Sequence, residues 1–150
     1  SVTATLSADE INTLANTVRK VPIADHVARY ALRLARFTRC DKAEAPDFVK
    51  DYVLWGAGPR ASQYLVLGAK ATAVLDGRLD VSIDDIRKVA HPVLRHRIKT
   101  NFNADAEGMT PDRIIDQLID ITPLVDADST DGGRLPEVFK PADSGQTTGS

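Results

Sequence analysis

The sequence predicts an all-α protein, a small bundle of about five helices followed by a polar, acidic C-terminal tail. Apolar residues recur at helical spacing in several stretches, and helix-start signals precede most of them. No alternation of apolar and polar residues is long enough to predict a sheet. The hydrophobic fraction of 43% is sufficient for a core, which excludes a wholly disordered chain.

Length, charge and cysteine content narrow the class of protein. The 150 residues allow one ordinary domain, and a net charge of −2 offers no general electrostatic reason to bind DNA. The single cysteine, Cys40, cannot form an internal disulfide, which favours a reducing, cytoplasmic compartment. We see no signal peptide and no apolar run of membrane-spanning length.

The first two helices follow from caps and apolar spacing. Ser7 and Glu10 have the spacing of a capping box, so a helix is predicted from there to Val21 and Pro22. Its predicted buried stripe is Ile11, Leu14, Ala15 and Val18. A second helix is predicted over 25–39. Its predicted buried face is Val27, Tyr30, Ala31, Leu34 and Thr38, whereas His26, Arg29, Arg33 and Arg36 point elsewhere.

The middle of the chain predicts a connector, a short strand and a long helix. A charged connector containing Pro46 spans 41–51, and the apolar run 53–55 is consistent with one small strand. The third helix is predicted from Pro59 to Leu75, before a left-handed cap at Gly77. Its small residues Ala61, Gly68, Ala69, Ala71 and Ala73 permit close packing, and Leu65, Thr72 and Leu75 are its predicted buried side.

Two further helices complete the predicted bundle. Ser82 and Asp85 begin the fourth, with Ile83, Ile86, Val89 and Ala90 along it; Pro92 ends or kinks it, and Val93 and Leu94 extend the pattern. A polar loop is predicted over 99–108. Thr110-Pro111 begins the fifth helix, which buries Ile114, Ile115, Leu118 and Ile119 and closes at Pro123. We therefore expect a helical domain over 1–124 and a flexible tail over 125–150.

Most residues with reactive side chains are interpreted as structural rather than catalytic or metal-binding. His26, His91 and His96 lie on different predicted elements without a neighbouring nucleophile, and Cys40 follows a helix end, which disfavours a thiolate. Trp55 is interpreted as a packing residue rather than a stacking platform. Asp126, Asp128, Asp131, Gly132 and Glu137 are in the wrong register for a calcium loop, and no metal site is expected.

Arg60 is the strongest functional candidate. The segment 56–60, Gly-Ala-Gly-Pro-Arg, places an arginine in the first turn of a long helix after a flexible approach. Helix N-termini attract anions, and a guanidinium matches phosphate oxygens. The alternative is a surface arginine in an ordinary ion pair. A second basic cluster, Arg95-His96-Arg97, is either a solvated face or a subunit contact.

Three segments resemble the MoxR-type AAA+ ATPases. Residues 56–61, Gly-Ala-Gly-Pro-Arg-Ala, resemble the Gly-Ala-Ser-Pro-Arg-Ala motif of that family. Asp76-Gly77-Arg78 with Val81, Asp85 and Ile86 resembles its next segment, and 92–98, Pro-Val-Leu-Arg-His-Arg-Ile, its closing signature. Residues 21–39 are similar to the helix that opens the family's C-terminal lid, so the resemblance covers about 5–121.

The resemblance implies a function for the chain. In the family, the lid follows an α/β core that carries the Walker motifs, binds ATP with Mg and assembles into rings, usually hexamers. The arginine of the Pro-Arg pair is the sensor-2 residue, which reaches the γ-phosphate; here that residue is Arg60, flanked by Gly58 and Pro59. Such ATPases resemble chaperones that remodel partner proteins, often ones with von Willebrand A-type domains.

The sequence departs from the family at one residue of the first motif, and it contains none of the motifs of the ATP-binding core. Gly58 stands where the motif has serine, so the helix lacks a side-chain cap, a loss of a few tenths of a kcal/mol. The core motifs are not in this chain, which by itself should not hydrolyse ATP. The alternative interpretations of the chain's function are a standalone helical interaction module and a DNA-binding helical domain.

Overall fold

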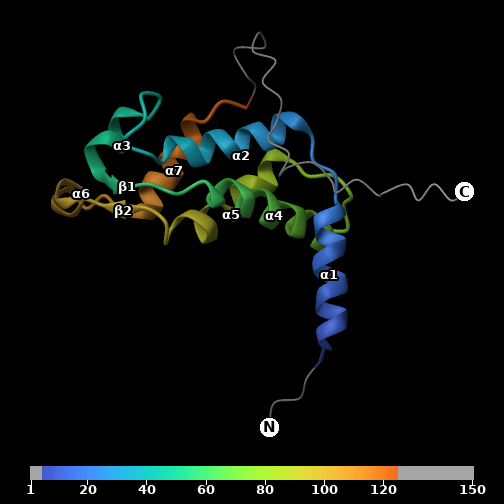
Figure 1. Ribbon diagram of the computed structural model, residues 1–150. Helices are drawn as coiled ribbons and strands as arrows, with labels where there is room; N and C mark the ends of the chain where they lie inside the picture. Colours follow the sequence, from blue (N-terminus) through green and yellow to red (C-terminus); the bar gives the residue numbers. More distant parts are fainter. Residues whose placement is uncertain (1–4, 125–150) are drawn as a thin grey trace, which may run out of the picture.

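Side-chain caps begin three of the five longer helices within residues 5–124, the part of the chain that the computed structural model describes. The residues predicted as a tail, 125–150, and the rejected calcium loop within it lie outside this range. Figure 1 shows the elements in chain order: α1 (Ala8–Lys20), α2 (Asp25–Phe37), α3 (Asp47–Tyr52), β1 (Val53–Trp55), α4 (Arg60–Leu75), α5 (Ile83–Leu94), β2 (Lys99–Thr100), α6 (Phe102–Glu107) and α7 (Pro111–Ile121).

The predicted helical bundle is confirmed, but residues 5–124 form seven helices rather than about five. The two additional helices, α3 and α6, lie where we predicted a connector and a polar loop. Each has six residues, too few to show an apolar period. They pack against each other, and the Tyr52 hydroxyl donates a hydrogen bond to Glu107 at 2.7 Å. Contact between α3 and α6 therefore stabilises two short helices that the local sequence does not predict.

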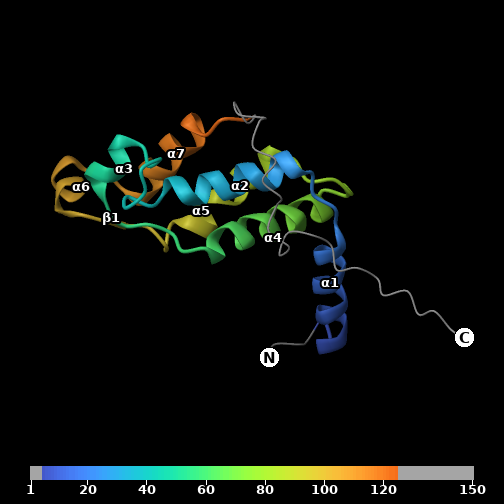
Figure 2. The same ribbon diagram turned by 45° about the horizontal axis from the view of Figure 1, so that its top comes forward.

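The strand predicted at 53–55 is confirmed, and its partner lies in the segment predicted as a loop. β1 pairs antiparallel with β2, with Val53 opposite Thr100 and Trp55 opposite Lys99. The pairing continues at Asn101, whose backbone N–H donates to the Tyr52 carbonyl at 2.9 Å. This small sheet lies with α3 and α6 at one end of the molecule (Figures 1 and 2).

The core lies among α2, α4, α5 and α7, which contact one another. The predicted buried face of α2 is confirmed, since Val27, Tyr30, Ala31, Leu34 and Thr38 are each at most 1% exposed. The small residues of α4 allow close packing on α5, because a Cβ at Gly68 would lie 3.4 Å from the Val89 side chain. α7 buries Ile114, Ile115 and Leu118 completely, whereas Ile119 is half-buried.

The ends of α4 and α5 confirm one predicted cap, but they correct the predicted burial of Leu75 and the predicted effect of Pro92. Gly77 has φ of +72°, which confirms the predicted left-handed cap after α4. Leu75, predicted to be buried, is 86% exposed, because it lies in the last turn beyond the core, and Thr72 is half-buried. Pro92 does not end α5, which continues to Leu94.

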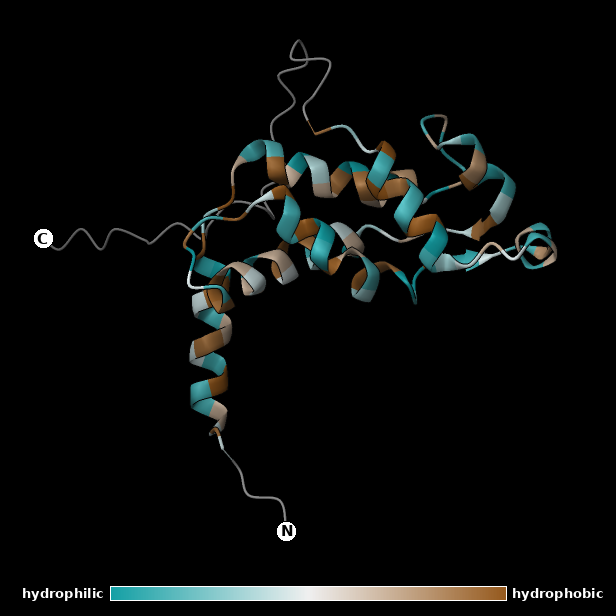
Figure 3. Ribbon diagram, turned by 180° about the vertical axis from the view of Figure 1, so that it is seen from behind, coloured by the Kyte–Doolittle hydropathy of each residue, from teal (hydrophilic) through white to brown (hydrophobic). Residues whose placement is uncertain are grey.

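The predicted buried stripe of α1 is wrong. The capping box of Ser7 and Glu10 is present, yet α1 contains no buried residue, and Ile11 and Leu14 are 54% and 53% exposed. The helix projects from the opposite end of the body to the small sheet (Figures 1 and 2), and apolar residues alternate with polar ones along it (Figure 3). Apolar spacing indicates a helix face but does not say which surface covers it.

Candidate functional site

The loop that leads to Arg60 is fixed to the C-terminal end of α2. The Ala57 N–H donates to the Thr38 hydroxyl at 2.9 Å, and the Arg39 Nε donates to the Ala57 carbonyl at 3.0 Å. Ala57 and Thr38 are both buried. Because both backbone groups of Ala57 are held, the start of α4 has a defined position relative to α2.

The two glycines of this loop are not equivalent. A Cβ at Gly56 would lie 2.0 Å from the Thr38 carbonyl oxygen, so only glycine allows the loop to approach α2 this closely. A Cβ at Gly58 would meet nothing within 4 Å. The absence of a side chain at Gly58, the position where the sequence departs from the motif, is therefore not required by packing.

We expect Gly56→Ala to destabilise the domain by about 1–3 kcal/mol, because the methyl group must displace backbone. Gly58→Ala is the matched control and should change the free energy of unfolding by less than about 0.5 kcal/mol. Urea denaturation of the two variants makes the comparison. Equal stability of the two would show that the close approach at Gly56 is not needed.

Arg60 is the first residue of α4 and is exposed. No hydrogen bond or ion pair joins the Arg60 side chain to any residue in the described range 5–124, so the ordinary ion pair is not observed there. The first turn of α4 contains no acidic residue and Pro59 provides no side-chain cap, although the Ala61 N–H donates to the Gly58 carbonyl at 3.0 Å. A cationic side chain beside an uncapped helix N-terminus is suited to binding a phosphate.

The second basic cluster is engaged within the chain. The Arg95 Nε donates to Asp112 at 2.7 Å. The Arg97 guanidinium contacts the Val93 carbonyl and the His96 ring, and lies 4.9 Å from the centre of the Tyr64 ring. Arg97 therefore packs on Tyr64, which lies about one turn after Arg60 in α4. Arg95 instead joins α5 to α7.

An ion pair that we did not predict fixes the turn between α4 and α5. Arg78 donates to both carboxylate oxygens of Asp85, at 2.9 and 2.6 Å, and Asp85 also accepts from the Ser82 N–H and hydroxyl. The Asp85 side chain is 1% exposed, and the guanidinium holds its pKa well below the usual value. These residues lie in the second segment of the family resemblance, so the signal was present in the sequence.

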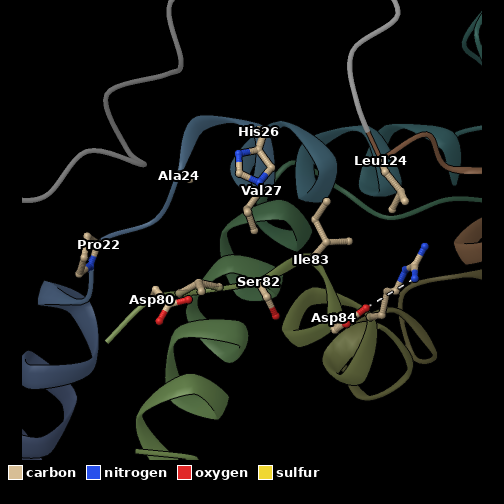
Figure 4. A pocket seen from close by; sticks show the side chains of 11 residues that line it. Pro22, Ala24, His26, Val27, Asp80, Ser82, Ile83, Asp84 and Leu124 are labelled. Carbon is tan, nitrogen blue, oxygen red and sulfur yellow. Dashed lines mark ion pairs between the residues drawn. The ribbon is translucent and has the colours of Figure 1, made fainter. Parts of the chain in front are cut away.

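The histidines and the cysteine show no catalytic arrangement in the described part of the chain. The two ring nitrogens of His91 lie 3.1 and 2.9 Å from Asp112 and Asp116, which joins α5 to α7. His26 is exposed and lines a pocket of about 530 Å³ between the start of α2 and residues 80–84 (Figure 4). Cys40 is a half-buried free thiol. No group of three His, Cys, Asp or Glu side chains within residues 5–124 is arranged so that it could hold a metal ion.

Trp55 is not the packing residue we predicted. Its side chain is 73% exposed, although Val53, two residues earlier, is buried. The register of the sheet shifts between Val53 and Trp55, and such an irregularity reverses the direction of the following side chain.

Trp55 is the only tryptophan of the chain and provides a direct test of this arrangement. We expect its fluorescence emission to lie close to that of free tryptophan in water, because most of the indole contacts solvent. Acrylamide should quench the emission nearly as well as it quenches the free amino acid. A blue-shifted, protected emission would contradict the exposed position.

Comparison with known proteins identifies the fold. Residues 47–118 match the AAA lid domain family. Chaperone MoxR1 of Mycobacterium tuberculosis is 31% identical over 115 residues, which cover 75% of this chain and 30% of that protein. A crystal structure of a proposed ATPase from Cytophaga hutchinsonii superposes with a TM-score of 0.69 at 32% identity, over 75% of this chain and 34% of that one.

The helical fold and the family match identify residues 47–118 as an AAA lid domain. The sequence and structural relatives place the chain with the lid domains of the MoxR-type AAA+ ATPases. The chain spans about a third of the length of these relatives. Within residues 5–124, no helix is long and apolar enough to cross a membrane.

Proposed function

We propose that this chain is the sensor-2 lid of an ATP-hydrolysing AAA+ enzyme, and that Arg60 contacts the γ-phosphate of ATP. The observation that carries the proposal is the exposed Arg60 guanidinium, which has no partner among residues 5–124, at an uncapped helix N-terminus. Gly58 and Pro59 support the role because neither adds a polar side chain that would occupy the N–H groups of the first turn. Mg is expected to be held by the core domain.

The mechanism follows from where charge develops. Hydrolysis of ATP increases negative charge on the γ-phosphate oxygens, and a positioned arginine stabilises that charge. Arg60 presents planar donors, and the Thr38 and Arg39 contacts to Ala57 position the start of its helix. Loss of the phosphate would break the contact and release the lid to rotate, which couples hydrolysis to movement.

The wider assembly follows from the family. We propose a cytoplasmic homo-hexamer that remodels partner proteins, with von Willebrand A-type domain proteins as clients. Arg95 and Arg97 are candidates for a contact with the neighbouring subunit. Arg95 is the better candidate, because its side chain is 58% exposed despite its ion pair with Asp112, whereas Arg97 is packed against Tyr64.

The coding sequence before Ser1 tests the class of the protein. An AAA+ ATPase requires an upstream glycine-rich phosphate loop ending in Gly-Lys-Ser or Gly-Lys-Thr. Its presence, with ATP hydrolysis by the full-length protein and none by the 150-residue chain, supports the proposal. A gene without such a loop favours the standalone interaction module, for which the exposed apolar residues of α1 are the supporting observation.

A further inference from the structure

Arg97 keeps one edge of its guanidinium free. The two hydrogen-bond contacts of this side chain, to the Val93 carbonyl and the His96 ring, both use the Nη1 atom. The Nε and Nη2 atoms donate to no residue between 5 and 124. These two atoms are also accessible, because within this range no buried side-chain nitrogen or oxygen lacks a hydrogen-bond partner. A planar pair of donors is therefore open to a ligand.

The position of this free edge is fixed by the surrounding structure. α5 packs along α4 (Figures 1 and 2), and the Arg97 guanidinium lies 4.9 Å from the centre of the Tyr64 ring, within the range of a cation–π interaction. The Arg97 N–H donates to the Leu94 carbonyl at 2.8 Å, and the next residue, Ile98, is buried. A donor that is already positioned loses less conformational freedom when it binds a ligand.

No carboxylate of the described chain neutralises Arg97. Arg95, two residues earlier, forms an ion pair with Asp112 at 2.7 Å, whereas Arg97 forms none with any residue between 5 and 124. The Arg60 side chain has no ion pair in that range either. Arg60 precedes Tyr64 by four residues, so the two share one face of α4. Two guanidinium groups thus lie near one tyrosine without a counter-charge, and an anion that contacts both relieves their repulsion.

We propose that Arg97 is a second residue that contacts the phosphates of the bound nucleotide, and that Tyr64 positions it. The inference rests on the proposed function, which assigns the γ-phosphate to Arg60. A nucleotide carries several phosphate groups in a row, so one ligand offers oxygens to two guanidinium groups that are about one helical turn apart. The free Nε and Nη2 donors of Arg97 match two oxygens of a single phosphate group.

The two arginines have different roles in this arrangement. Arg60 contacts the group that is transferred, so its contribution appears in turnover. Arg97 contacts a phosphate that is bound both before and after hydrolysis, so it contributes to nucleotide affinity. ADP distinguishes the two residues, because it lacks the γ-phosphate but keeps the other two phosphate groups.

Binding of ADP to the full-length protein, measured by isothermal titration calorimetry, tests the assignment. We expect the dissociation constant to rise at least about tenfold in Arg97→Ala, and to stay within about twofold of wild type in Arg60→Ala. Lys88→Ala is the matched control, because this cation of α5 lies 3.4 Å from Asp76, at the other end of α4, and should bind ADP as wild type does.

Variants of Tyr64 test the positioning role. Tyr64→Phe keeps the aromatic face under the guanidinium and should bind ADP with wild-type affinity. Tyr64→Leu removes that face and should weaken binding by about two- to fivefold. Equal affinities in Tyr64→Phe and Tyr64→Leu would show that Tyr64 does not position Arg97.

Wild-type ADP affinity in Arg97→Ala overturns the proposal. Weaker binding together with a smaller assembly in analytical ultracentrifugation also overturns it, because a lost subunit contact then explains the effect. Arg97→Lys keeps the charge but not the planar edge, so it should show intermediate affinity, and it replaces Arg97→Ala if that variant does not fold. Wild-type ATP turnover in Arg60→Ala removes the sensor role of Arg60 alone, since the ADP measurement on Arg97→Ala is independent of it.

Discussion

Replacing Arg60 with alanine in the full-length protein should lower ATP turnover by about 100- to 1,000-fold while the lid stays folded. One positioned donor to a developing negative charge contributes about 3–4 kcal/mol to transition-state stabilisation. Stability should not change, because the Arg60 side chain makes no hydrogen bond or ion pair with any residue between 5 and 124. Phosphate release under saturating ATP, together with thermal unfolding of the same preparation, gives both measurements.

Two control variants define the role of the guanidinium. Arg60→Lys keeps the charge but loses the planar pair of donors, so it should recover only part of the turnover. Arg113→Ala removes an exposed arginine of α7 whose side chain donates a hydrogen bond to the Gly108 carbonyl, and this variant should hydrolyse ATP at the wild-type rate. Unchanged turnover in Arg60→Ala would exclude the sensor role.

Replacing Asp85 with asparagine should destabilise the domain by about 2–3 kcal/mol. The substitution leaves the Arg78 guanidinium without its buried partner, and breaking a buried ion pair typically costs about 3–5 kcal/mol. The expected value is lower because the Arg78 side chain is 33% exposed and keeps its contact with Asp76. Asp84→Asn is the control, since the Asp84 side chain is 77% exposed.

The loss of stability in Asp85→Asn should depend on pH. The pKa of Asp85 is lowered in the folded state, so the carboxylate stabilises the fold above the ordinary carboxyl pKa of 3.8 and this contribution is lost as the pH falls. Urea denaturation at pH 7 and near pH 3 should therefore show a large difference from wild type at the first pH and a smaller one at the second. A difference independent of pH would assign the effect to packing alone.

Local signals predicted the parts of the fold that depend on local chemistry. The capping boxes at Ser7 and Ser82 and the left-handed turn at Gly77 are properties of a few neighbouring residues, and all three are present. The buried face of α2 was also predictable, because helical spacing identifies the face and the body of the domain supplies its cover.

Features that depend on distant residues were not predictable in this way. α3 and α6 are stabilised by contact with each other, and the exposure of Trp55 follows from a register shift set by a partner strand 44 residues away. The local sequence indicated Arg60 as a candidate and the family resemblance implied its role, but only the structure reveals the Thr38 and Arg39 contacts that position its helix. The ion pair of Arg78 and Asp85 lay within a recognised motif, yet the motif does not state which side chains meet.

The contacts of Ala57 with the end of α2 also have a mechanical consequence. A force applied at Arg60 would be transmitted to α2 as well as to α4, because Thr38 and Arg39 hydrogen-bond the loop before α4. The two helices would then rotate together as one rigid unit, and α4 would not slide along α2. Thr38→Val would remove the hydrogen bond from the Ala57 N–H and so weaken the mechanical coupling between α2 and α4.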